Sequence, residues 1–237
     1  MTFMQNLMTA YVALAIAGGA AHASETAYDG PVEIELTFVD HIGAEMTEQD
    51  VFVRRDGQPG VWRATPGDRD LGAPVFTSAE PVPHDPFDPM AVGPYPVGQD
   101  LGMTLGDWLG AEGHGSYSCV DGEGEIDITF TGLVPDGVYT MWNFYMASPP
   151  TDPFIGTYDL PFGNRDGSES VFQADASGNA HFERSMAPCL QLSGEHLMAG
   201  LAIAWHSDGE TYGALPGDFG YNSHAHLFVG LPQRSGL

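Results

Sequence analysis

Apolar and polar side chains alternate along several short segments of this chain. In residues 125–131, EIDITFT, apolar residues at every second position are separated by acidic and hydroxyl residues. Residues 31–38 repeat the pattern, with Val, Ile, Leu and Phe on one side and Glu and Thr on the other. A period of two is typical of a strand that buries one face and exposes the other. We therefore expect antiparallel sheets with one face in a core.

The strands predicted from this pattern form a series that continues to the end of the chain. Asp-Gly pairs at 121, 136, 166 and 208 mark turns between them. Strands do not alternate with long helices, which favours an all-β fold, an antiparallel β-sandwich. The predicted strands are 31–38, 116–120, 125–131, 138–146, 170–173, 180–186, 196–205 and 224–230, together with a short hairpin formed by 51–54 and 61–64.

Three other segments are expected to differ from these strands. Residues 104–111, TLGDWLGA, are predicted to form a short helix capped by Thr104. Residues 80–97 contain six prolines and are expected to take an extended course across the sandwich. Residues 147–167 contain four prolines and are predicted to form a long loop, the kind of segment in which binding sites tend to lie.

The turn after residues 125–131 has the spacing of a tyrosine corner. Leu133, Pro135 and Tyr139 occupy positions from which a tyrosine returns its hydroxyl to the backbone just upstream. Many β-sandwiches are closed by such a corner, so it supports the same fold class. We divide the mature chain into an N-terminal part, 24–100, that belongs to the same domain, and a sandwich core, 101–237.

Residues 1–23 have the features of an export signal peptide. An apolar run at 7–17 is followed by small residues that end in Ala21-His22-Ala23, which predicts cleavage after Ala23. The run is shorter than the roughly 20 apolar residues that cross a bilayer, and no later segment is apolar enough to span a membrane. We therefore expect a secreted or periplasmic protein. Cleavage after Ala21 is the alternative, and it would expose His22 as an N-terminal copper ligand.

The cysteine content agrees with export. Cys119 and Cys189 are the two cysteines of the chain. An oxidising compartment favours the pairing of an even number of cysteines, so we expect a Cys119–Cys189 disulfide. Neither cysteine has a second one within the spacing of a zinc site.

The charge of the chain excludes some classes of partner. There are 32 acidic residues against seven basic ones, all of them Arg, for a net charge of −25. Because the recognition of phosphates needs clusters of Lys and Arg, we expect neither nucleic acid nor anionic lipid as a partner. The same surface should attract divalent cations loosely.

Two histidines near the C-terminus are candidate metal ligands. His224 and His226 stand two residues apart in a predicted strand, which places both imidazoles on one face. Neutral imidazole suits copper or zinc. His206 is the candidate third ligand, with Met141 or Met146 as alternatives for copper. In the competing interpretation, the pair occupies a polar strand face and never meets His206.

Other catalytic and ion-binding motifs are incomplete. Adjacent His206-Ser207-Asp208 has the residue types of a hydrolytic triad, but the members of a triad converge from separate segments. The Gly-x-Ser-x-Gly motif of a nucleophile elbow does not occur. Oxygen-bearing residues alternate in 164–169 as in a calcium loop, but the twelve-residue pattern is missing, so the segment predicts a turn first and a calcium site as the alternative.

We therefore expect a binding or surface-interaction module without catalytic activity. Aromatic residues around the long loop would form its ligand surface, and an extracellular protein or glycan would be its partner. The alternative is a copper or zinc protein centred on the three histidines. The residues of the expected ligand surface are Trp142, Tyr145, Phe154 and Tyr158.

Two stretches resemble a signature of secreted bacterial proteins of unknown function. Residues 132–142, GLVPDGVYTMW, are similar to GLxPNGVYTxW, with Asp136 in place of the usual Asn, and residues 206–213, HSDGETYG, are similar to HxDGxTxG. The corner at 133–139 also resembles that of fibronectin type III domains. The resemblance extends from about residue 108 to the end. It implies a β fold and export, and no activity.

Overall fold

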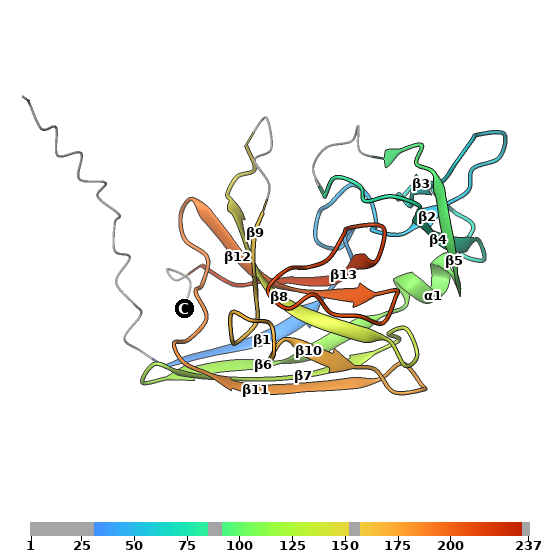
Figure 1. Ribbon diagram of the computed structural model, residues 1–237. Coiled ribbons are helices and arrows are strands. Elements are labelled where there is room, and N and C mark those ends of the chain that lie inside the picture. The colour runs from blue at the N-terminus through green and yellow to red at the C-terminus, as the bar shows by residue number, and fades with distance from the viewer. Residues whose placement is uncertain (1–30, 85–91, 152–156, 234–237) are drawn as a thin grey trace, which may run out of the picture.

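The computed structural model of the chain describes residues 31–84, 92–151 and 157–233. Within these ranges the chain forms thirteen strands and one short helix, arranged as three antiparallel sheets (Figure 1). Two of the sheets lie face to face and enclose the largest cluster of buried apolar residues. The predicted all-β, antiparallel sandwich is therefore confirmed.

The first layer of the sandwich has the strand order β1-β6-β7-β11. Buried and exposed residues alternate along the whole length of β1 and β7, as their sequences predict. One face of this layer therefore meets the core and the other meets solvent. The strands are β1 (Val32–Phe38), β6 (Glu112–Val120), β7 (Glu123–Thr131) and β11 (Ala180–Met186).

The second layer has the order β10-β8-β12-β13, and β9 also pairs with β8. Unlike the first layer, it is buried on both faces along most of β12 and β13. A second apolar cluster, which includes Met46 and Phe228, covers its outer face. The strands are β8 (Val138–Ala147), β9 (Tyr158–Pro161), β10 (Val171–Gln173), β12 (Leu197–His206) and β13 (Ser223–Gly230).

A small third sheet packs at one end of the sandwich, beside the helix α1 (Leu105–Leu109) (Figure 1). Its order is β3-β2-β4-β5, and the pairing of β2 with β3 confirms the predicted hairpin. Val51, Val53 and Val75 belong to the same buried cluster as the sandwich residues. The strands are β2 (Phe52–Val53), β3 (Trp62–Arg63), β4 (Pro74–Ser78) and β5 (Val97–Thr104).

Three strands were not predicted, and part of the proline-rich segment cannot be compared. β4, β5 and β9 pair with neighbours, although β5 shows no regular alternation of buried and exposed residues. β9 lies inside the expected loop 147–167. Within 80–97, residues 85–91 lie outside the described ranges.

The predicted cap and the predicted cross-link are both present. The Thr104 hydroxyl accepts a hydrogen bond from the Asp107 amide, and the Asp107 carboxylate accepts one from the Thr104 amide, which together make a capping box. A disulfide joins Cys119 at the end of β6 to Cys189 after β11, with 5.9 Å between the two Cα atoms. No helix of the described residues is long and apolar enough to cross a membrane.

Tyr139 makes the hydrogen bond expected of a tyrosine corner. Its hydroxyl accepts from the Val134 amide at 3.0 Å and lies 3.3 Å from His226 Nδ1. Burial raises the pKa of the Tyr139 hydroxyl, so the hydroxyl keeps its proton and can donate it to the imidazole. Tyr139 thus links the corner to β13.

Replacing Tyr139 by Phe should lower the free energy of unfolding by about 1–3 kcal/mol, because both partners of the hydroxyl lose their hydrogen bond in a buried place. Chemical denaturation of the Tyr139→Phe variant measures the change. Tyr117→Phe is the matched control, since it removes one hydrogen bond, from the Leu190 amide. An equal or smaller loss for Tyr139→Phe than for Tyr117→Phe would contradict the two-partner role.

Candidate functional site

The three candidate metal ligands do not converge. In the pairing of β12 with β13, Trp205 lies opposite His224, and His206 lies opposite Ser223. Residues opposite each other point to the same face of a sheet, and successive residues point to opposite faces. His206 therefore faces away from His224. Among the described residues, no group of three or more His, Cys, Asp or Glu side chains could hold a metal ion.

The imidazoles are buried and bound to protein groups. His206 Nε2 lies 2.8 Å from Thr140 Oγ1. His226 Nε2 donates to the Trp108 carbonyl oxygen at 2.8 Å, and its ring stacks on that of Trp108 with 3.6 Å between centroids. Desolvation by burial lowers the pKa of both histidines to about 4. Both rings are therefore neutral at pH 7 and belong to the packing of β12 and β13.

The remaining ion-binding hypotheses find no support in the geometry. Met141 lies in the main core and Met146 in the cluster on the outer face of the second layer. In the turn 164–169, the Asp166 and Glu169 carboxylates accept hydrogen bonds from amides of the turn itself. His22 lies outside the described residues.

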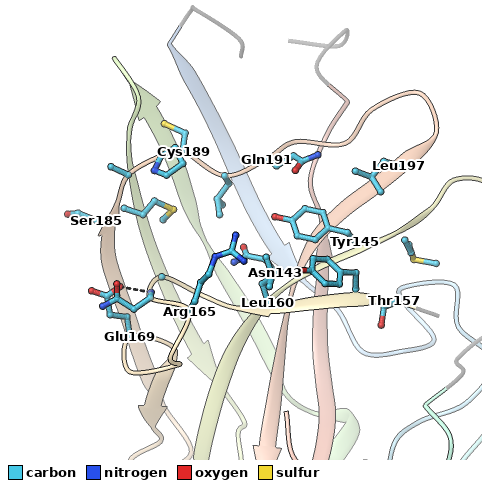
Figure 2. Close-up of a pocket in the computed structure, with 18 of the residues that line it drawn as sticks. Asn143, Tyr145, Thr157, Leu160, Arg165, Glu169, Ser185, Cys189, Gln191 and Leu197 are labelled. Atoms are coloured by element: carbon cyan, nitrogen blue, oxygen red, sulfur yellow. Dashed lines mark hydrogen bonds between the residues drawn. The ribbon is translucent and has the colours of Figure 1, made fainter. Parts of the chain in front are cut away.

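An open cleft of about 970 Å³ lies at one end of the sandwich (Figure 2). One wall comes from β8 and β9, where Tyr145 lies directly opposite Tyr158, with 6.4 Å between ring centroids. Residues 185–191, which follow from the end of β11 through the disulfide, form the opposite wall. Two of the four predicted ligand-surface residues thus line one cleft.

The cleft is a continuation of the inner face of β8. Tyr139 and Met141 on this face are fully buried in the core. Asn143 and Tyr145, at the next alternate positions, are only partly buried and line the cleft. The same alternation that builds the core therefore carries polar and amphipathic side chains to the place where the two layers separate.

Arg165 supplies a positive charge at this cleft. Its side chain extends toward Asn143 and Tyr145 (Figure 2). No hydrogen bond or ion pair joins Arg165 to another described residue. Burial raises the pKa of the Tyr145 hydroxyl, and the Arg165 charge opposes this shift. The cleft therefore presents two aromatic rings beside an unpaired guanidinium group.

The other two predicted ligand-surface residues are placed differently. Trp142 is 4% exposed, and its indole nitrogen donates to Thr140 Oγ1 at 2.7 Å, so it is a core residue and not part of an exposed patch. It points to the opposite face of β8 from Tyr145, because the two residues are three positions apart, an odd number, along the strand. Phe154 lies outside the described residues.

Sequence patterns did not predict the second wall of the cleft. Met186 is the last residue of β11, and Pro188 and Gln191 follow it in a stretch without a motif. Cys189 is part of this wall, and its disulfide with Cys119 is the one signal that could have placed residues 185–191 beside β6. Arg165 could have been noticed as one of seven cations in a strongly acidic chain.

Comparison with protein families, curated proteins and solved structures finds no match to this chain.

Proposed function

We propose that this protein is an exported binding module that holds a glycan in the cleft lined by Tyr145 and Tyr158. The observation that carries the proposal is that two tyrosines on paired strands lie side by side in an open cleft, and that Tyr158 is 61% exposed. Arg165, which pairs with no other described residue, lies beside them. The Ala21-His22-Ala23 pattern and the Cys119–Cys189 disulfide support export.

A sugar suits this combination of side chains. The faces of a sugar ring carry C–H groups that pack on tyrosine rings, while its hydroxyls need hydrogen-bond partners. Asn143, Arg165 and Gln191 provide amide and guanidinium groups around the rings. The net charge of −25 repels polyanions, so the expected ligand is a neutral oligosaccharide, with Arg165 donating to its hydroxyl oxygens.

Replacing Tyr158 by Ala should weaken the binding of a neutral oligosaccharide about tenfold or more. The loss of one aromatic stacking contact, with the area that it buries, costs about 1.4 kcal/mol, and this energy corresponds to a factor of ten in Kd. Titration calorimetry with neutral β-linked and α-linked oligosaccharides measures Kd for the wild type and the variant. Because Tyr158 is largely exposed, the variant should keep its melting temperature.

Tyr221→Ala is the matched control, since Tyr221 is also an exposed tyrosine, at 45%, and does not line the cleft. Its Kd should equal that of the wild type. The proposal is wrong if no neutral oligosaccharide binds at millimolar concentration, or if Tyr158→Ala and Tyr221→Ala bind equally well.

A further inference from the structure

At the end of β12 opposite the cleft, the fold places Ser207 against His224. Ser207 follows directly after the last residue of β12, and His224 is the second residue of β13. The Ser207 hydroxyl oxygen lies 3.1 Å from His224 Nε2. The cleft and Ser207 are roughly 30 Å apart along β12, at about 3.3 Å for each residue. This pair is therefore independent of the proposed glycan site.

Hydrogen bonding sets the tautomer of His224. Its Nδ1 lies 2.9 Å from the backbone carbonyl oxygen of Asp50. A carbonyl oxygen only accepts, so Nδ1 carries the proton, and Nε2 of the neutral ring keeps its lone pair. The Ser207 hydroxyl, whose oxygen also lies 3.4 Å from the Tyr221 carbonyl oxygen, can then donate to Nε2, the nearer of the two acceptors. This arrangement is the one that activates a nucleophile: the Ser207 hydroxyl contacts a basic nitrogen of His224, and the Asp50 carbonyl oxygen orients that imidazole.

The surroundings hold His224 in place and leave Ser207 accessible. The His224 side chain is fully buried, and its ring lies 5.4 Å from that of Trp205. Desolvation by burial lowers the pKa of His224, as does nearby Arg63, while the buried Asp50 carboxylate opposes this shift. Ser207 is only partly buried. A reagent can therefore reach the hydroxyl, while the base behind it cannot rotate away.

The turn after Ser207 offers a donor for a developing negative charge. The amides of Ser207, Gly209 and Glu210 donate to Asn222 O, His206 O and Asp208 Oδ1 respectively. The Asp208 amide has no acceptor among the described residues. In hydrolases of the nucleophile-elbow type, the amide that follows the nucleophile is one of the oxyanion donors.

We propose that Ser207 and His224 form a nucleophile and general base that accept an acyl group from a neutral or cationic ester. The Ser207 oxygen attacks the ester carbonyl carbon while its proton moves to His224 Nε2. The carbon–oxygen bond to the leaving alcohol then breaks, and the alcohol takes the proton from Nε2. Water, deprotonated by His224 in turn, attacks the acyl carbon; the bond from this carbon to the Ser207 oxygen breaks, the acid leaves, and the Ser207 oxygen takes the proton back from Nε2. Asp208, Glu210 and Asp218 surround the turn with negative charge, which disfavours anionic esters.

A fluorophosphonate probe tests the pair directly, because serine displaces its fluoride to form a stable covalent adduct. With the intact, disulfide-bonded protein, we expect one adduct per chain, located at Ser207 by peptide mass spectrometry and absent in Ser207→Ala. Ser168→Ala, which removes an exposed turn hydroxyl, should label like the wild type. With p-nitrophenyl esters, a trimethylammonium-bearing acyl group should react faster than a carboxylate-bearing one. Absence of an adduct at Ser207 overturns the proposal.

The role of His224 needs its own variant. In His224→Asn, the side-chain amide can keep the donor to the Asp50 carbonyl oxygen but removes the base, so labelling should slow at least about 100-fold. Equal labelling rates would exclude His224 as the base. Should this variant fail to fold, Ser207→Cys and Ser168→Cys replace it. Iodoacetamide should alkylate the introduced cysteine of Ser207→Cys at least about tenfold faster than that of Ser168→Cys. An equal or slower rate for Ser207→Cys overturns the proposal.

Discussion

Lowering the pH from 7.5 to 5 should decrease the free energy of unfolding by on the order of 4 kcal/mol. Two buried histidines alone account for an effect of this size, and the lowered pKa values of His41, His84 and His224 act in the same direction. Burial lowers the pKa of His206 and His226 to about 4, against 6.5 for an exposed histidine. At pH 5 the unfolded chain therefore binds protons that the folded chain does not. Each histidine contributes on the order of 2 kcal/mol to this difference.

The direction of the effect follows from the order of the two pKa values. Because the folded pKa lies below the unfolded one, the stabilisation is fully present above pH 6.5 and is lost as the pH falls toward 4. Asp159 acts in the opposite direction, since burial raises the pKa of its carboxyl to about 6. One carboxyl does not compensate for several buried histidines, so the net change is a loss.

Chemical denaturation at pH 7.5, 6 and 5 measures the dependence, and two variants assign it. His226→Gln removes one buried titrating group and should reduce the loss between pH 7.5 and 5 by on the order of 2 kcal/mol. His196→Gln changes a histidine whose side chain is 85% exposed and should keep the slope of the wild type. The same stability at pH 7.5 and 5 would contradict the interpretation of these histidines as buried and neutral.

Replacing Asp50 by Ala should destabilise the protein by about 3–5 kcal/mol, because it leaves a charge buried without its partner. The Asp50 carboxylate accepts from Arg63 Nη1 at 2.6 Å and from the Ala225 amide at 3.0 Å, and both side chains of this ion pair are almost fully buried. The substitution therefore removes the counter-charge of Arg63 and the acceptor for the Ala225 amide of β13, the strand at the edge of its sheet.

Two further variants separate the charge from the packing. Asp68→Ala breaks a partly exposed pair with Arg55 and should cost about 1 kcal/mol. Asp50→Ala combined with Arg63→Met removes both charges and should recover part of the lost stability, since a buried pair can be replaced by apolar residues with little loss. A cost for Asp50→Ala no larger than that for Asp68→Ala would show that the buried pair is not needed.

The edge of β13 shows why residues 39–50 could not be interpreted from sequence. His41 Nε2 lies 2.9 Å from the Ala225 carbonyl oxygen, and Val39 exchanges two backbone hydrogen bonds with Phe228. Residues 39–50 therefore complete the hydrogen bonding of a strand more than 170 positions away. No local pattern marks these residues, because their partners are backbone groups of a distant segment.

Only some residues of the candidate sites could be predicted from the sequence. Tyr145 and Tyr158 were predicted to be ligand-surface residues because they are aromatic and lie around the expected loop 147–167, and strand pairing places them side by side. Trp142 was assigned to the same surface, although alternation along β8 turns it to the other face. His206-Ser207-Asp208 attracted attention as neighbours in sequence, but Ser207 finds its histidine in β13.

The all-β class, most strands, the capped helix, the corner tyrosine and the disulfide could be predicted without a structure. Each of these depends on short-range periodicity, on local turn and cap chemistry, or on the pairing of two cysteines. Three features could not be predicted in this way: which faces of β8, β12 and β13 are buried, that the three histidines do not converge, and where a cleft opens. These features depend on strand register, and a shift of one residue in register reverses the face of every side chain.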